Sequence, residues 1–69
     1  MPLSRDAHKE AMRSTIRAGV DAAELIDSFR WRRLTSEDIK VRRVLMVVHS
    51  AGEAARDVLD MMEENDGQL

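Results

Sequence analysis

Residues 41–48, with the sequence VRRVLMVV, decide between two folds for this 69-residue chain. Four of the eight residues are valine, whose β-branched side chain favours strands. A strand here gives a helix–strand–helix fold, in which the strand pairs with its twin across a dimer axis because the chain offers no other partner. A continuous helix gives an all-α antiparallel helical hairpin. We predict the helix, because Arg42, Arg43, Asp57 and Asp60 keep helical spacing to the apolar positions around them.

The strand alternative has further support just downstream. Ser50 and Glu53 have the spacing of a capping box, which would begin a new helix there. Gly52 also weakens a continuous helix, by about 1 kcal/mol relative to alanine. In the helical interpretation, Gly52 marks a close contact or a kink.

The order of charges along the chain favours the hairpin. A first helix, at about residues 4–29, and a second, at about residues 36–65, both carry their basic residues early and their acidic residues late. This order opposes the helix macrodipole, by about 0.3–1 kcal/mol for each well-placed charge. Antiparallel packing brings each basic stretch beside an acidic one. The basic residues are Arg5, Lys9, Arg13, Arg17, Lys40, Arg42 and Arg43, and the acidic ones are Asp21, Glu24, Asp27, Asp57, Asp60, Glu63 and Glu64.

Helix-start signals place the turn. Ser4 is a candidate N-cap for the first helix, and Thr35 with Ser36, followed by two acidic residues, begins the second. The turn therefore falls at about residues 30–35. We expect residues 66–69 to fray, and residues 1–69 to form a single domain.

The apolar residues predict one intramolecular and one intermolecular contact. The first helix has an apolar face with little bulk around Ala18, Gly19, Ala22 and Ala23, where a second helix can approach closely. Five consecutive apolar residues at 44–48 make the second helix apolar on nearly every side, so that it needs more than one neighbour. We predict a homodimeric four-helix bundle with the second helix at its centre. The expected apolar face of the first helix includes Met12, Ile16, Val20, Ala23, Ile26 and Phe29, and the expected dimer interface consists of Val44, Leu45, Val47, Val48, Ala51, Ala55, Val58 and Met62.

Composition narrows the class of protein. A net charge of −2 argues against nonspecific attraction of the whole molecule to nucleic acid or to a membrane. The chain has no cysteine, and therefore no disulfide framework, and it has no apolar run long enough for a membrane span or a signal peptide. We expect a cytoplasmic protein.

Two charged surfaces are candidate partner-binding sites. At the predicted turn, arginines alternate with an aromatic residue, as contacts to phosphate and stacking on bases would require. Helical hairpin dimers that bind structured RNA, as in plasmid copy-number control, resemble this chain in architecture. Alternatively, Phe29 and Trp31 cap the core while the arginines remain solvated. The basic site consists of Arg30, Trp31, Arg32, Arg33, Arg42 and Arg43, and the acidic site near the C-terminus of Asp57, Asp60, Glu63 and Glu64.

The sequence predicts no catalytic, cofactor or metal site. His8 and His49 are too few and too far apart to suggest metal ligands. His49 and Ser50 are adjacent on a helix and point in different directions, which rules out nucleophilic activation between them. We predict a non-enzymatic protein-binding regulator, an adaptor or inhibitor that docks on a larger protein such as a transcription regulator. Short helical proteins of this kind are frequent among bacterial anti-activators and phage-encoded inhibitors. The alternative is a nucleic-acid-binding hairpin dimer that uses the basic site.

Overall fold

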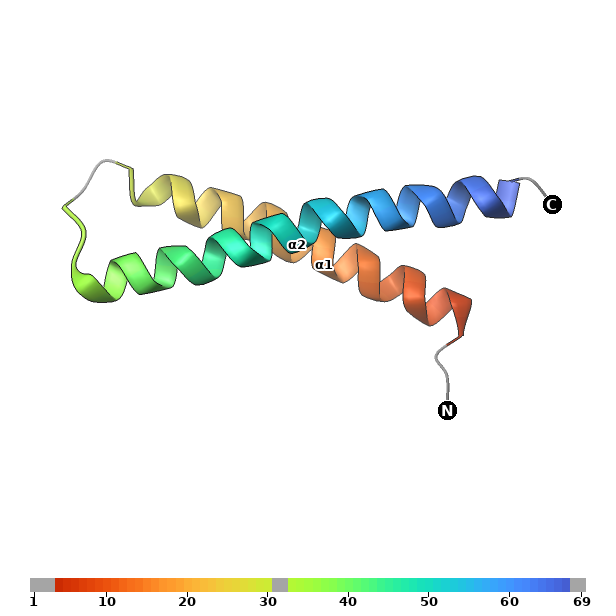
Figure 1. Ribbon diagram of the computed structural model, residues 1–69, viewed down its shortest axis with the longest axis horizontal. Helices are drawn as coiled ribbons and strands as arrows, with labels where there is room; N and C mark the ends of the chain where they lie inside the picture. The colour runs from red at the N-terminus through yellow and green to blue at the C-terminus, as the bar shows by residue number, and fades with distance from the viewer. Residues whose placement is uncertain (1–3, 31–32, 68–69) are drawn as a thin grey trace.

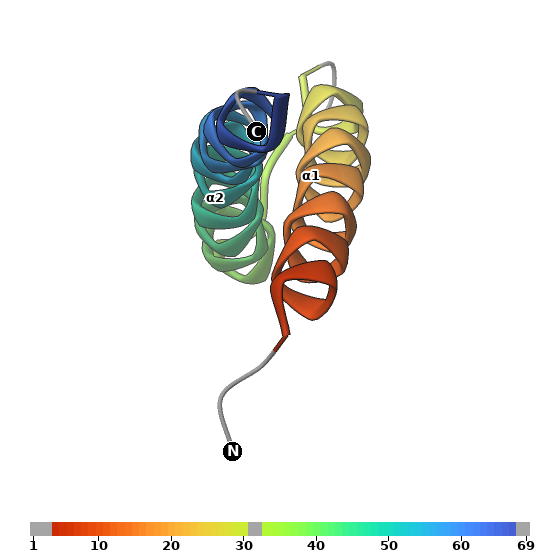
Figure 2. The same ribbon diagram turned by 90° about the vertical axis from the view of Figure 1, so that its right-hand side faces the viewer.

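The computed structural model describes residues 4–30 and 33–67, which form two long helices and part of the connection between them. Helix α1 spans Arg5–Ser28 and helix α2 spans Ser36–Gly67. The helices run antiparallel and cross near the middle of the molecule, with the two chain ends on one side and the connection on the other (Figure 1). After a turn of 90° the same helices lie side by side (Figure 2). The prediction of an all-α helical hairpin is confirmed.

The strand predicted as the alternative for residues 41–48 is wrong. These residues are helical and lie within the first half of α2. Their helical spacing directs Leu45 and Val48 toward α1, whereas an isolated strand would leave its backbone groups without partners in this chain. The gain from packing against α1 therefore outweighs the strand preference of valine.

Both helices begin at caps that the sequence predicts. The Ser4 hydroxyl accepts a hydrogen bond from the Ala7 backbone N–H at 3.1 Å. At the start of α2, the Asp38 N–H donates to Thr35 Oγ1 at 3.1 Å, and the Thr35 N–H donates to Asp38 Oδ2 at 2.9 Å. This reciprocal pair is a capping box, which satisfies backbone donors that the first turn of a helix leaves free.

The helices approach most closely at a pair of glycines. A Cβ atom added to Gly52 would lie 2.9 Å from the Gly19 Cα and 3.2 Å from the Thr15 carbonyl oxygen, and a Cβ added to Gly19 would lie 2.9 Å from the Gly52 Cα. Backbone therefore packs directly on backbone, at the close contact that the small residues of the first helix predict. Any side chain at either position would force the helices apart.

The core between α1 and α2 is thin. Among the described residues, the buried hydrophobic side chains are those of Ala22, Phe29, Ala55 and Met62. Val20, which the spacing places on the inner face of α1, is 49% exposed, because the glycine contact brings α2 to the Gly19 and Ala22 side instead. The hairpin alone consequently leaves much of its apolar surface uncovered.

Opposite charges meet at the end where the termini lie. The Arg5 Nε donates to Asp66 Oδ1 at 2.7 Å, the Lys9 ammonium also binds the Asp66 carboxylate, and Arg13 lies 3.9 Å from Glu63. Hydrogen bonds from Lys9 and then Arg5 hold the pKa of Asp66 below its ordinary value. Helix α2 continues to Gly67, past the predicted end at residue 65, because these basic side chains hold its last turn.

Neither helix of the described chain has an apolar stretch that would cross a lipid bilayer.

Candidate functional site

An apolar stripe runs along α2 on the side that α1 does not cover. Its members alternate at intervals of three and four residues, which keeps them on one flank of the helix. The exposed fractions are 63% for Val44, 70% for Val47, 39% for Val58 and 56% for Met61, and the two alanines between them are also exposed. We call this surface the α2 stripe: Val44, Val47, Ala51, Ala54, Val58 and Met61.

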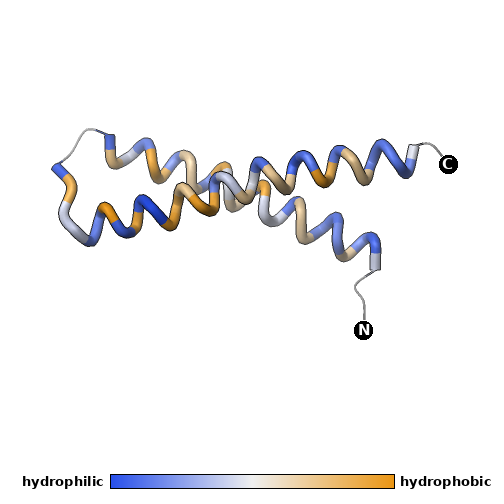
Figure 3. Tube along the Cα trace, viewed as in Figure 1, coloured by the Kyte–Doolittle hydropathy of each residue, from blue (hydrophilic) through white to orange (hydrophobic). Residues whose placement is uncertain are grey.

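The predicted dimer interface divides between two flanks of α2. Four of its members, Val44, Val47, Ala51 and Val58, belong to the α2 stripe. The other four, Leu45, Val48, Ala55 and Met62, lie on the flank that packs against α1, where Ala55 is 4% and Met62 9% exposed. Figure 3 shows why the sequence does not separate the two sets, since a continuous hydrophobic stretch of α2 lies just before the crossing.

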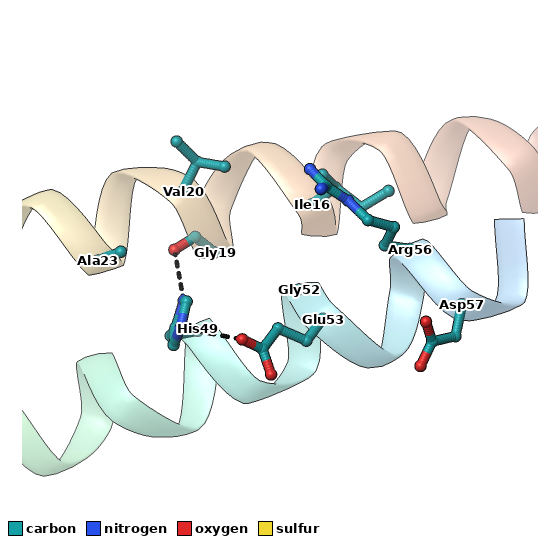
Figure 4. A pocket seen from close by; sticks show the side chains of 9 residues that line it. All are labelled: Ile16, Gly19, Val20, Ala23, His49, Gly52, Glu53, Arg56 and Asp57. Atoms are coloured by element: carbon teal, nitrogen blue, oxygen red, sulfur yellow. Dashed lines mark hydrogen bonds and ion pairs between the residues drawn. The ribbon is translucent and has the colours of Figure 1, made fainter. Parts of the chain in front are cut away.

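A shallow groove lies on a third flank of α2, which belongs neither to the α2 stripe nor to the contact with α1, beside the glycine crossing (Figure 4). Its volume is about 460 Å³, and its polar side comes from α2 while its apolar side comes from α1. The His49 Nδ1 lies 3.3 Å from the Gly19 carbonyl oxygen, and its Nε2 lies 3.3 Å from the Glu53 carboxylate. Both contacts are hydrogen bonds only when both ring nitrogens carry a proton. The lining residues are Ile16, Gly19, Val20, Ala23, His49, Gly52, Glu53, Arg56 and Asp57.

This groove has no arrangement for nucleophilic catalysis. His49 contacts a carbonyl and a carboxylate, and Ser50 is exposed and forms no hydrogen bond with the ring. Within residues 4–30 and 33–67, no group of three or more acidic, histidine or cysteine side chains is placed to hold a metal ion. His8 is exposed on α1, on the other helix from His49.

The basic site predicted at the connection is present only in part among the described residues. Arg30, Arg33, Arg42 and Arg43 are exposed, and Arg30 lies 3.5 Å from Asp27. Trp31 and Arg32 lie outside the described residues. Phe29 is buried, 8% exposed, as expected if it closes this end of the core. It also lines a second cavity of about 460 Å³, which lies between the end of α1 and the start of α2.

The acidic site lies at the opposite end of the molecule. Asp57, Asp60, Glu63 and Glu64 are all exposed. Glu63 pairs with Arg13, but the other three form no ion pair with a described residue. The same is true of Lys40, Arg42 and Arg43 near the connection. Because the long axis of the molecule measures 53 Å, one hairpin does not bring the basic and acidic sites together.

No protein-family model, curated protein or solved structure matches this chain.

Sequence reasoning missed two features of the site. The Asp66 contact with Arg5 and Lys9 falls in a segment whose composition predicts fraying. The α2 stripe was missed as a separate surface, because Leu45, Val48, Ala55 and Met62 on the flank facing α1 keep the same helical spacing as the stripe.

Proposed function

We propose that this chain is a small non-enzymatic protein-binding regulator of the cytoplasm, an adaptor or inhibitor that works as a homodimeric four-helix bundle and docks on a larger protein such as a transcription regulator. The observation that carries the proposal is the apolar surface that the hairpin leaves uncovered. Large exposed apolar patches mark protein-interaction sites in water-exposed proteins.

The amount of exposed surface supports this function. The hairpin exposes 5698 Å². A compact monomer of 7.9 kDa exposes about 4,400 Å² by the scaling of surface with mass, so the surplus is roughly 1,300 Å². One partner of a standard protein–protein interface buries about 800 Å². The surplus therefore suffices for a stable contact with another protein.

The charged ends supply the surface for the larger partner. Arg33 and Arg42 are exposed near the connection and form no ion pair with a described residue, so they are available to acidic groups on another protein. Arginine is enriched among residues that dominate binding energy at protein interfaces. Exposed charges of both signs also accelerate encounter with a complementary surface.

Nucleic-acid binding by the same arginines is the second candidate function. It is favoured by Lys40, Arg42 and Arg43 at the start of α2, which are exposed and form no ion pair with a described residue. The acidic end of the same helix and the net charge of −2 oppose it, because a phosphate backbone would be repelled along half of the molecule.

An affinity experiment separates the two functions. The chain is immobilised, exposed to nuclease-treated lysate of its host, and compared with an Arg33→Glu, Arg42→Glu variant and with Arg17→Glu, a control at an exposed position in the middle of α1. We expect one protein to be retained by the wild type and the control and lost by the double variant. The captured protein is then purified and titrated directly against the chain.

Two results would contradict the proposal. The first is that no protein binds directly after purification. The second is binding of RNA or DNA whose affinity falls steeply with salt concentration, which is the signature of phosphate contacts and would favour the second candidate function.

A further inference from the structure

The sizes of the side chains along the α2 stripe follow almost the same order from either end. Its outer members, Val44, Val47, Val58 and Met61, are large, and its two central members, Ala51 and Ala54, are small. If a second α2 lies antiparallel across the stripe, Val44 faces Met61, Val47 faces Val58 and Ala51 faces Ala54. Each large side chain then meets another large one, and the paired alanines allow the helix backbones to approach at the centre.

Charges beside the stripe select the same orientation. Arg43 and Glu64 flank its two ends on the same side, and neither forms an ion pair with a described residue of its own hairpin. In the antiparallel arrangement Arg43 lies within about 3 Å, along the seam, of the level of Glu64 of the second copy, and symmetry produces this pair twice. In a parallel arrangement Arg43 and Glu64 of the two copies would lie near opposite ends of the seam, and this pair could not form.

The crossing of the two helices leaves room for this contact. The centre of the α2 stripe lies at the level of Gly52, which contacts Gly19 on the flank of α2 that faces α1. The residue of α1 beside this crossing on the side of the stripe is Ala18, which is small and exposed. No bulky side chain of α1 therefore obstructs the centre of the stripe.

From these observations we infer that the α2 stripe binds a second copy of this chain, with the two α2 helices antiparallel about a two-fold axis between Ala51 and Ala54, and with Arg43 paired to Glu64 of the second copy. This inference rests on the proposed function, since it specifies how two copies pair in the proposed homodimer. Each end of the dimer then carries Arg42 and Arg43 of one copy beside the acidic site of the other. A larger partner would meet surfaces of mixed sign at both ends.

Cross-linking tests the orientation, because the chain has no cysteine and single thiols can be introduced cleanly. The chains Val44→Cys and Met61→Cys are mixed, allowed to exchange and treated with a short bis-maleimide. We expect covalent dimers that contain one chain of each kind, identified by mass. Two copies of residue 44 would lie about 25 Å apart along the seam at 1.5 Å per residue, so Val44→Cys alone should not cross-link. Mixing Met61→Cys with Glu53→Cys, on the groove side of α2, is the negative control.

Charge reversal tests the pairing independently. Sedimentation equilibrium should show that Arg43→Glu and Glu64→Arg each raise the dimer dissociation constant by about 10-fold, and that the double variant returns it toward the wild-type value. The matched control is Arg17→Glu, whose side chain lies on α1 away from the stripe and which should not change the constant.

The outcomes separate this inference from the proposed function. Cross-linking of Val44→Cys with itself, or a double variant no tighter than the single ones, overturns the antiparallel seam. A chain that stays monomeric at millimolar concentration overturns the second copy as the occupant. In that case, a larger protein that binds the wild-type chain but not the Val47→Asp variant would still support the protein-binding function. Failure of the affinity experiment would contradict the proposed function whether the chain is a monomer or a dimer.

Discussion

Replacing Gly52 with alanine tests the closest contact in the hairpin. The new Cβ would lie 2.9 Å from the Gly19 Cα, whereas ordinary van der Waals contacts begin at 3.4 Å, so the backbones must separate by about 0.5 Å at the crossing. A gap of this size already forfeits about a quarter of the dispersion attraction between the atoms concerned. Overpacking of this kind costs about 1–3 kcal/mol.

The same substitution also brings a gain, which must be separated from the clash. Alanine is favoured over glycine inside a helix by about 1 kcal/mol, so the net loss for Gly52→Ala is about 0–2 kcal/mol. Gly67→Ala is the matched control, since its Cβ meets nothing within 4 Å. The control keeps some of the helix gain without the clash.

Thermal unfolding followed by circular dichroism at 222 nm, at one fixed protein concentration, provides the measurement. We expect Gly52→Ala to melt below Gly67→Ala, with a difference of about 4–8 °C for each 1 kcal/mol of net destabilisation. If Gly52→Ala instead melts at or above Gly67→Ala, the helices are not held in backbone contact at residues 19 and 52, and the reasoning is refuted.

Three further predictions concern other parts of the hairpin. Val47→Asp, on the α2 stripe, should keep the helical signal and abolish self-association. Val48→Asp, on the flank facing α1, should instead lower the stability of the hairpin by about 2 kcal/mol. Equal effects of the two substitutions in sedimentation and melting experiments would show that the flanks are assigned wrongly. Because the folded-state pKa of Asp66 is lowered, its contacts should contribute fully above the ordinary carboxyl value of about 3.9 and be lost as the pH falls through the lowered value. The protection of amides near Gly67, relative to their intrinsic exchange rate at each pH, should therefore fall in acid, and Asp66→Asn should remove this pH dependence. Phe29→Ala should cost about 3 kcal/mol in denaturant unfolding, and a loss below about 0.5 kcal/mol would mean that this ring does not close the core.

The sequence predicts where the helices begin because the capping residues are local signals. It predicts their antiparallel arrangement because the order of charges along each helix favours a neighbour of opposite direction. Ser4 and Thr35 are visible as caps, and basic residues at the start of each helix require acidic ones nearby. At the end of the molecule where the termini lie, Asp66 provides this acidic neighbour through its ion pairs with Arg5 and Lys9. At the other end, Lys40, Arg42 and Arg43 have no ion pair with a described residue, so charge order alone does not determine which pairs form.

The rotation of α2 about its own axis is what sequence reasoning could not settle. Five consecutive apolar residues at 44–48 cover most of the circumference of a helix, and so they do not indicate which flank faces α1. The glycine pair settles the rotation, because only one orientation brings Gly52 against Gly19. Val48 and Met62 then turn inward and Val44 and Val58 remain outside, which divides an interface that the sequence presents as one.

The glycine crossing also has a mechanical consequence. Gly52 lies close to the midpoint of α2, so that about 24 Å of helix extends on either side at 1.5 Å per residue. Because glycines form the contact, α1 and α2 can pivot about this point. Moving the helices apart at one end of the molecule would then displace them relative to each other at the other end. Separating the two helices at the connection would therefore strain the contacts of Asp66 with Arg5 and Lys9, about 45 Å away along α2 at 1.5 Å per residue.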